Sequence, residues 1–213
     1  MTTTLQAIEN ARLYGILDLS YVEQGMACTV TEKMLAGGVQ IIQLRAKHHP
    51  VEIVQKVGIA LALLCREQSV PFIINDHPAL VMEIGADGAH IGQDDMPVAE
   101  ARRLAGPDAI LGKSSHSVAQ ATATAQEDVA YLGFGPLFAT PTKPDYHPIG
   151  LTNIQEAHRL VTKPLFCIGG VKQENLPTVL AAGARRIVIV SGILQATDIV
   201  SYCRACREVL DAN

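Results

Sequence analysis

Short apolar runs alternate with longer amphipathic stretches from one end of the chain to the other. Apolar runs bounded by glycine or polar residues are typical of buried parallel strands, and apolar positions three and four residues apart are typical of helices. The pattern predicts eight strands, at residues 13–17, 40–44, 72–74, 88–91, 109–111, 131–134, 165–168 and 187–190. It predicts helices at residues 50–67, 98–104, 118–126, 154–160, 174–181 and 199–212. Such alternation indicates a parallel α/β fold.

Eight strand–helix units within 213 residues, with no linker rich in Pro, Gly or Ser, predict a (β/α)₈ TIM barrel. We expect a single domain over residues 1–213, with a short N-terminal extension at 1–12. A doubly wound open sheet is the alternative, because a count of strands does not establish closure. That alternative lacks its dinucleotide fingerprint: Asp18-Leu19-Ser20 follows the first strand where Gly-x-Gly-x-x-Gly would stand.

Composition indicates which classes of partner this protein is not expected to bind. Apolar residues make up 48% of the chain and charged residues 18%, as in a folded globular protein, and the net charge of -4 offers no broad attraction to nucleic acid or an anionic membrane. The first residues lack the features of a secretory signal, and no apolar run approaches a membrane span. Five scattered cysteines make no disulfide framework. We expect a cytoplasmic protein; its oligomeric state stays open, a homo-oligomer included.

The second predicted strand ends in a polar ladder. Side chains alternate between the two faces of a strand, so Gln43, Arg45 and Lys47 project to one side, and Leu44 and Ala46 to the other. Two cations held close together favour an anion, and the fork of an arginine beside the point charge of a lysine suits a phosphate or diphosphate. The alternative is a solvated strand end with ordinary surface cations.

Polar residues also follow the other strands. The active site of a barrel gathers at the carboxyl ends of its strands. Asn75-Asp76 follows the third strand and Asp94-Asp95 the fourth, so oxygen ligands lie on the same rim as the cations. We expect Mg²⁺ bridging these carboxylates to a diphosphate. Asp76 has an alternative role as a helix N-cap, and one of Asp94 and Asp95 is expected to be only solvated.

A second anion site is expected at the ends of the last three strands. Gly169-Gly170 and Val190-Ser191-Gly192 expose backbone N–H groups after strands seven and eight, where barrels often hold a phosphate. The loop Thr140-Pro141-Thr142-Lys143 reaches the same end of the barrel. Two anion sites indicate two phosphorylated ligands.

These residues form an ordered set of motifs over almost the whole chain. In order they are Gln43-Leu44-Arg45-x-Lys47, Asn75-Asp76, His90-Ile91-Gly92-Gln93-x-Asp95, Ser114-x-His116, Gly135-Pro136-x-Phe138-x-Thr140-x-Thr142-Lys143, Ile168-Gly169-Gly170 and Val190-Ser191. Together they resemble the thiamine-phosphate synthase family. The resemblance implies a (β/α)₈ transferase that joins 4-amino-2-methyl-5-hydroxymethylpyrimidine diphosphate to a hydroxyethylthiazole phosphate, with or without a carboxylate, giving thiamine monophosphate and diphosphate.

The resemblance also implies roles for individual positions. The pyrimidine diphosphate would contact Gln43, Arg45, Lys47, Asn75, Ser114 and Lys143. Catalysis would rest on Arg45, Lys47, Ser114 and Lys143. Mg²⁺ would be bound by Asp76 and Asp95, and the thiazole phosphate by Thr140, Thr142, Gly170, Val190 and Ser191. The chain departs from the family pattern at His77-Pro78-Ala79 and at Lys113, and these departures bear on fine specificity.

The implied mechanism is loss of diphosphate from the pyrimidine methylene, followed by capture of the resulting cation by the thiazole nitrogen. No side-chain nucleophile is needed, and Ser114 and His116 have no evident third group to orient them as a nucleophile and base. One alternative is a thiazole tautomerase of the same fold, with His116 as its acid–base group, but it leaves the cations and carboxylates without a joint purpose. The other is a non-catalytic barrel that binds a phosphorylated metabolite.

Overall fold

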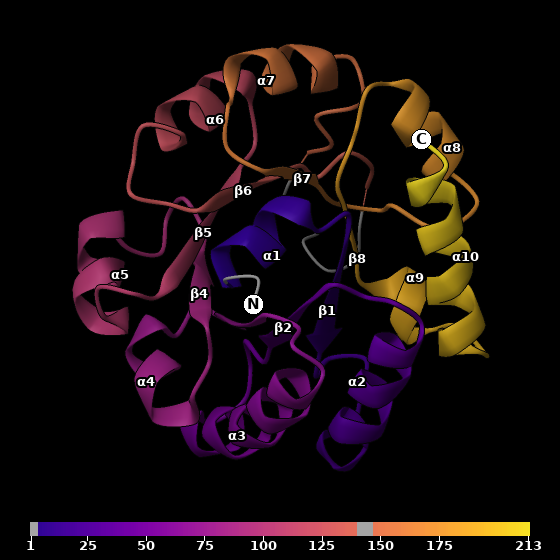
Figure 1. Cartoon of the computed structure of the whole chain (residues 1–213). Helices are drawn as coiled ribbons and strands as arrows, with labels where there is room; N and C mark the ends of the chain where they lie inside the picture. Colours follow the sequence, from indigo (N-terminus) through magenta and orange to yellow (C-terminus); the bar gives the residue numbers. More distant parts are fainter. Residues whose placement is uncertain (1–3, 140–146) are drawn as a thin grey trace.

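The computed structural model describes residues 4–139 and 147–213, and in it eight parallel strands close into a barrel in chain order (Figure 1). The strands are β1 (Leu13–Asp18), β2 (Ile41–Arg45), β3 (Phe72–Asn75), β4 (Gly88–Ile91), β5 (Ile110–Ser115), β6 (Tyr131–Phe134), β7 (Leu165–Cys167) and β8 (Ile187–Ile189). The first and last strands pair, with Leu13 beside Ile187. The predicted barrel is therefore confirmed, and the open sheet is excluded.

The helices surround the barrel (Figure 1). They are α1 (Thr4–Asn10), α2 (Ala27–Ala36), α3 (Val51–Glu67), α4 (Val81–Ile84), α5 (Val98–Ala105), α6 (Val118–Thr124), α7 (Ile154–Leu160), α8 (Leu176–Ala181), α9 (Ser191–Leu194) and α10 (Ile199–Asp211), with 3₁₀ turns at Gln24–Met26 and Pro78–Leu80. The sequence pattern missed α1, α2, α4 and α9. The latter two have four residues each, and α2 buries small or polar residues beside Met34, so its apolar stripe is weak.

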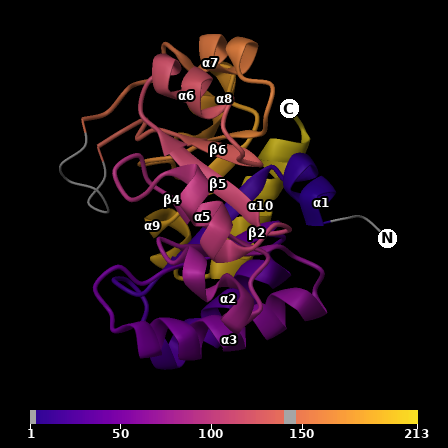
Figure 2. The same cartoon turned by 90° about the vertical axis from the view of Figure 1, so that its left-hand side faces the viewer.

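The apolar side chains form two cores, as the alternation of strand faces requires. The larger core lies between the strands and the helices. The smaller one fills the barrel itself and includes Tyr14, Tyr131 and Phe166. Ile8 of α1 belongs to this inner core and is fully buried, because α1 covers the amino-terminal end of the barrel (Figures 1 and 2). The segment expected as an extension thus closes one end of the barrel.

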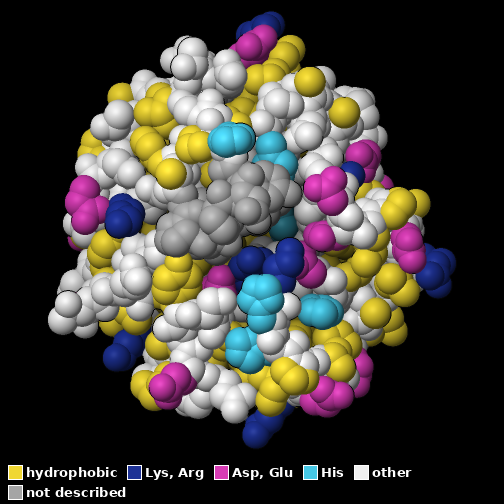
Figure 3. Space-filling view, turned by 180° about the vertical axis from the view of Figure 1, so that it is seen from behind, with side chains coloured by type: hydrophobic (Ala, Val, Ile, Leu, Met, Phe, Trp, Pro, Cys, Tyr) yellow, Lys and Arg dark blue, Asp and Glu magenta, His cyan; other side chains and the backbone are white. Residues whose placement is uncertain are grey.

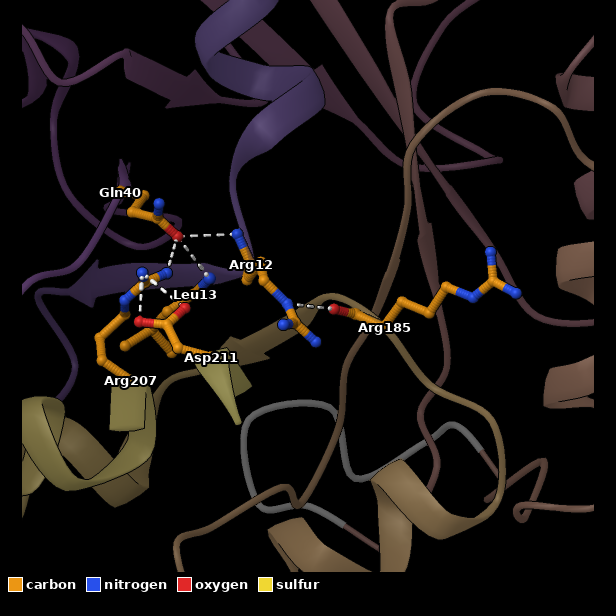
Figure 4. Close-up of polar contacts among 6 residues, drawn as sticks. All are labelled: Arg12, Leu13, Gln40, Arg185, Arg207 and Asp211. Atoms are coloured by element: carbon orange, nitrogen blue, oxygen red, sulfur yellow. Dashed lines mark hydrogen bonds and ion pairs between the residues drawn. The ribbon is translucent and has the colours of Figure 1, made fainter. Parts of the chain in front are cut away.

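Polar contacts stabilise the amino-terminal end of the barrel (Figure 4). The side-chain oxygen of Gln40 accepts hydrogen bonds from the backbone N–H groups of Arg12, at 2.8 Å, and Leu13, at 3.2 Å. Arg207 of α10 also donates to this oxygen, and pairs with Asp211 at 2.8 Å. One amide therefore ties the terminal helix to the start of β1, and the opposite end of the barrel is left for ligands.

None of the helices within 4–139 and 147–213 is long and apolar enough to cross a membrane.

Candidate active site

A cavity opens at the carboxyl ends of the strands, away from α1. Seven of the residues predicted from the sequence line it: Gln43, Arg45, Asn75, Ser114, Gly170, Val190 and Ser191. Figure 3 shows this face of the molecule, where Lys and Arg side chains gather beside several His side chains. The cavity interior is largely apolar and aromatic, with Tyr14, Tyr131 and Phe166 in its wall. A rim that carries Arg45 thus lies above a pocket with aromatic walls.

Arg45 is held by a partner that the sequence analysis did not select. Its Nε donates to Oδ2 of Asp18 over 3.0 Å, and the Asp18 side chain is only 2% exposed. The second carboxylate oxygen of Asp18 accepts the backbone N–H of Ser20 at 2.9 Å. The carboxylate therefore holds the guanidinium by its inner nitrogen, and Arg45 lines the cavity.

Lys47 and two carboxylates form a cluster beside the cavity. Nζ of Lys47 lies 3.9 Å from Oδ2 of Asp76. The pKa of Asp76 is raised, first by burial and then by the charge of Asp95 and a hydrogen bond with it, while Lys47 and Arg45 act in the opposite direction. Asp95 Oδ2 also accepts the backbone N–H of Gly92 at 2.6 Å. Two carboxylates that disfavour each other's ionisation are suited to share a cation.

The structure decides between the alternatives left open for these aspartates. Asp95 is the carboxylate that interacts with Asp76, although the side chains of Asp94 and Asp95 are both exposed. Asp76 is not the N-cap of the following turn, whose cap position is His77. It adopts a φ of 62°, the left-handed region that is costly for a non-glycine residue, and its carboxylate forms a hydrogen bond with Asp95. Within the described residues, no group of three or more His, Cys, Asp or Glu could hold a metal ion.

A buried chain of hydrogen bonds crosses the cavity floor. Nε2 of Gln43 donates to the Tyr14 hydroxyl at 2.8 Å, and that hydroxyl lies 3.0 Å from the hydroxyl of Tyr131. Nδ1 of His90 lies 3.2 Å from the Tyr131 hydroxyl, and Nε2 lies 3.0 Å from Oγ of Ser114. The sequence analysis did not select the two tyrosines or His90 as site residues. Polar atoms within buried strands were the available signal, since such atoms need partners.

The positions predicted for the thiazole phosphate divide into two groups. Gly170, with a φ of 65°, lies beside Gly169 at the end of β7, and Val190 and Ser191 follow β8 at the same cavity. Thr140 and Thr142 lie outside the described residues, as does Lys143 of the predicted diphosphate site.

Two residues that the sequence left in question have clear positions. His116 lines the cavity, and its Nδ1 donates to the carbonyl oxygen of Gly135 at 2.5 Å. Ser114 contacts His90, so the structure does not pair it with His116. Lys113 lies on the outer side of β5, and its Nζ is 3.0 Å from Oε2 of Glu127. Lys113 therefore supplies no charge to the cavity.

A family model described as thiamine monophosphate synthase matches residues 13–193. The chain belongs to the thiamine monophosphate synthase family. The match spans all eight strands and every described side chain of the cavity, so family and site coincide.

Individual members of the family agree with this. The chain is 45% identical over 182 residues to a thiamine-phosphate synthase of Thermus thermophilus, covering 84% of this chain and 87% of the relative. It is 38% identical to that of Chloroflexus aurantiacus, covering 95% and 94%. It is 40% identical to that of Synechococcus sp. strain WH7803, covering 97% of this chain but 58% of that longer relative.

Solved structures add the fold. A thiamine phosphate pyrophosphorylase from Pyrococcus furiosus superposes with a TM-score of 0.87 at 29% identity, covering 96% of this chain and 98% of that one. A (S)-3-O-geranylgeranylglyceryl phosphate synthase from Thermoplasma acidophilum has a TM-score of 0.77 at 13% identity, covering 100% of both chains, and shares the fold alone. Family, relatives and fold support a transferase of the thiamine-phosphate synthase type, and not the isomerase alternative.

Proposed function

We propose that the chain condenses 4-amino-2-methyl-5-hydroxymethylpyrimidine diphosphate with hydroxyethylthiazole phosphate, with or without a carboxylate, to give thiamine monophosphate and diphosphate. One observation carries the proposal: Arg45, Lys47 and the Asp76–Asp95 pair meet beside an aromatic-walled cavity. The cations and carboxylates suit a diphosphate leaving group, and the cavity suits the ring that carries it.

The diphosphate would bind through Arg45, Lys47, Asn75 and Lys143. Arg45 is suited to this task because Asp18 engages only its Nε, so both terminal nitrogens can donate to phosphate oxygens. Lys47 is half-exposed and 3.9 Å from Asp76, a loose contact that a phosphate can replace. As the bond to the pyrimidine methylene breaks, negative charge grows on the diphosphate, and fixed cations stabilise that charge.

Asp76 and Asp95 would hold Mg²⁺ in this proposal. The pKa of Asp76 is raised by burial and by the neighbouring charge of Asp95, so a divalent cation between the two carboxylates would be favoured. Mg²⁺ commonly takes one or two carboxylates together with substrate phosphates and water. A bound Mg²⁺ would supply positive charge to the diphosphate oxygens. Among the described residues no group of three or more His, Cys, Asp or Glu could hold a metal ion, so the remaining ligands would come from substrate and water.

The second substrate would bind where β7 and β8 end. Its phosphate would meet backbone N–H groups at Gly170, Val190 and Ser191, joined by Thr140 and Thr142 from the loop outside the described residues. Phosphate on the second substrate would thus sit across the cavity from the diphosphate. This arrangement directs the thiazole nitrogen toward the methylene carbon from which the diphosphate departs, so no side-chain nucleophile is required.

We also propose that the protein works in the cytoplasm. All five cysteines are free thiols, which suits a reducing compartment.

The deciding experiment is an assay with both substrates and Mg²⁺ that follows diphosphate release and thiamine monophosphate together. We expect one product of each kind per turnover. Arg45→Ala and Lys143→Ala should each lower kcat by about 10²-fold or more with the fold intact, because they stabilise charge formed in the reaction. Arg103→Ala removes an exposed arginine of α5 and is the matched control.

Two outcomes would overturn the proposal. Saturable binding of both substrates without turnover would favour the non-catalytic barrel. An unchanged rate in both Arg45→Ala and Lys143→Ala would remove the assignment of the diphosphate site.

A further inference from the structure

The hydrogen-bond chain across the cavity floor joins residues from five strands: Gln43 (β2), Tyr14 (β1), Tyr131 (β6), His90 (β4) and Ser114 (β5). Every link is between 2.8 and 3.2 Å. Gln43 and both tyrosines are buried, and buried polar groups are expected to have hydrogen-bond partners within the protein. The direction of each hydrogen bond therefore follows from counting donors and acceptors.

The count starts at Gln43, whose amide nitrogen has only hydrogens to offer and donates to the Tyr14 oxygen. Tyr14 has one hydrogen of its own, and its one remaining partner in the described structure is the hydroxyl of Tyr131. Tyr14 therefore donates to Tyr131, and Tyr131 in turn donates to Nδ1 of His90. The reverse order would leave the buried Tyr14 hydrogen without an acceptor, at a cost of about 1–3 kcal/mol.

The direction at Tyr131 fixes the histidine. Because Nδ1 of His90 accepts, its ring hydrogen resides on Nε2, which donates to Oγ of Ser114. Ser114 lines the cavity and has one acceptor position filled by His90, so its own hydrogen is directed to the cavity. At the other end of the chain, the amide nitrogen of Gln43 is engaged and its carbonyl oxygen is the group that a ligand can reach.

We propose that Tyr131 is a positioning residue whose hydroxyl sets the direction of this chain, so that Ser114 presents a hydrogen and Gln43 presents an oxygen to the substrate. The inference rests on the proposed function and deepens it. An aminopyrimidine carries an amine that donates and ring nitrogens that accept, which matches an oxygen at Gln43 and a hydrogen at Ser114. The 4-oxo analogue replaces the amine with an acceptor and adds a ring N–H, and it mismatches both ends.

The surroundings hold Tyr131 in place. Its ring packs edge-to-face against Phe166, with centroids 5.7 Å apart, and against Tyr14, at 5.9 Å. The His90 ring lies 5.5 Å from the Tyr131 ring on the other side. Burial raises the pKa values of both tyrosines, so both hydroxyls keep their hydrogens at neutral pH. A rigid cluster of this kind preserves one set of directions through binding.

Tyr131→Phe tests the proposal because it keeps the ring and removes only the hydroxyl. The variant and the wild type are compared by kcat/KM for the aminopyrimidine diphosphate and for its 4-oxo analogue. We expect the preference for the amino substrate to fall by about tenfold or more, because the direction of the chain is no longer fixed. Thr31→Val is the matched control: it removes a buried hydroxyl from α2, away from the cavity, and the preference should not change.

A second measurement does not depend on turnover. Nitrogen-15 NMR of labelled histidine reports which ring nitrogen of His90 carries the hydrogen. We expect Nε2–H in the wild type and in Thr31→Val, and a shift of population toward Nδ1–H in Tyr131→Phe. Nδ1–H in the wild type, or an unchanged substrate preference in Tyr131→Phe, overturns the inference. If the wild type forms no thiamine monophosphate, the proposed function fails, while the NMR result still decides the direction of the chain.

Discussion

Asp18 and Arg45 form an ion pair across β1 and β2, with Oδ2 of the aspartate 3.0 Å from Nε of the arginine. The two side chains are 2% and 13% exposed, so the pair is shielded from water. The register of the strands places the two residues directly beside each other. An acidic residue at the end of β1 therefore sets the orientation of a cation proposed to bind diphosphate.

Asp18→Asn tests this relationship. The asparagine keeps the size of the side chain and an oxygen acceptor but removes its charge, so the Arg45 guanidinium is held less firmly. We expect kcat/KM to fall about 10–100-fold and the free energy of unfolding to fall by about 3–5 kcal/mol, as for other broken buried pairs. Urea denaturation and steady-state kinetics measure the two effects.

Asp128→Asn is the control for that change. Asp128 also pairs with an arginine, Arg102, at 2.7 Å, but its side chain is 71% exposed. Such a pair contributes about 0–1 kcal/mol, so both the stability and the kinetics should stay close to the wild type. Equal losses in the two variants would contradict a special role for Asp18.

The carboxylate pair predicts opposite effects on activity and stability. Asp95→Asn removes a metal ligand in our proposal, so activity should be lost, and EDTA should inactivate the wild type with recovery on added Mg²⁺. Burial is the main cause of the raised pKa of Asp76, and in the metal-free protein the same change removes the second cause, the negative charge of Asp95. We expect the Tm at pH 7.5 without metal to rise by about 2–4 °C, equivalent to about 1 kcal/mol.

The metal-free melting curve separates two readings of this variant. A lower Tm for Asp95→Asn without metal would mean that Asp95 stabilises the fold through its own contacts, including that with Gly92. Full wild-type activity in EDTA would contradict the metal site itself.

His158 predicts a loss of stability at acidic pH. Burial lowers its pKa to about 4, and the charges of Arg185 and Arg186 add to the effect. The unfolded chain, with a histidine pKa of about 6.5, binds the proton more readily, so this stability is complete above about pH 6.5 and is lost as pH falls toward 4. Discounted for partial exposure, the loss is about 1–2 kcal/mol.

Urea denaturation at pH 7.5 and at pH 5 measures this effect. His158→Gln should reduce the difference between the two pH values, whereas His147→Gln, which removes an exposed histidine, should leave it in place. An undiminished difference in His158→Gln would assign the acid sensitivity to other groups.

The close approach of Gly112 to the ring of Tyr131 allows a steric test of the cavity floor. A Cβ at this position of β5 would overlap the ring of Tyr131. Gly112→Ala should therefore displace the tyrosine, reduce stability by about 1–3 kcal/mol and lower kcat/KM. Gly25→Ala, where a Cβ would meet no atom within 4 Å, is the control, and its stability and activity should be unchanged.

Much of the site could be predicted because strand ends are visible in a sequence. Two residues of the polar ladder, Gln43 and Arg45, line the cavity, and Leu44 and Ala46 enter the outer core, whereas Lys47 is not part of the cavity lining and lies beside Asp76. Period-two alternation needs no knowledge of neighbouring strands. The same local information could not choose between Asp94 and Asp95, because that choice depends on the position of Asp76, which follows the preceding strand, β3.

The two tyrosines show a second kind of contact that could not be predicted from the sequence. In the sequence, Tyr14 and Tyr131 are large residues within apolar runs and are expected simply to fill a core. They do fill it, but their hydroxyls also link Gln43 to His90 across the barrel. The residues are 117 positions apart, and only closure of the barrel brings their oxygens to 3.0 Å.

The sequence by itself determined the number and order of the strands, the faces of their side chains and the polar residues that end them, because these follow from local periodicity. The tertiary structure decided which of those residues touch: Asp18 with Arg45, Asp76 with Asp95, and Tyr14 with Tyr131. Contacts across a closed barrel depend on register and on the curvature of the whole sheet, and neither is encoded within a single strand.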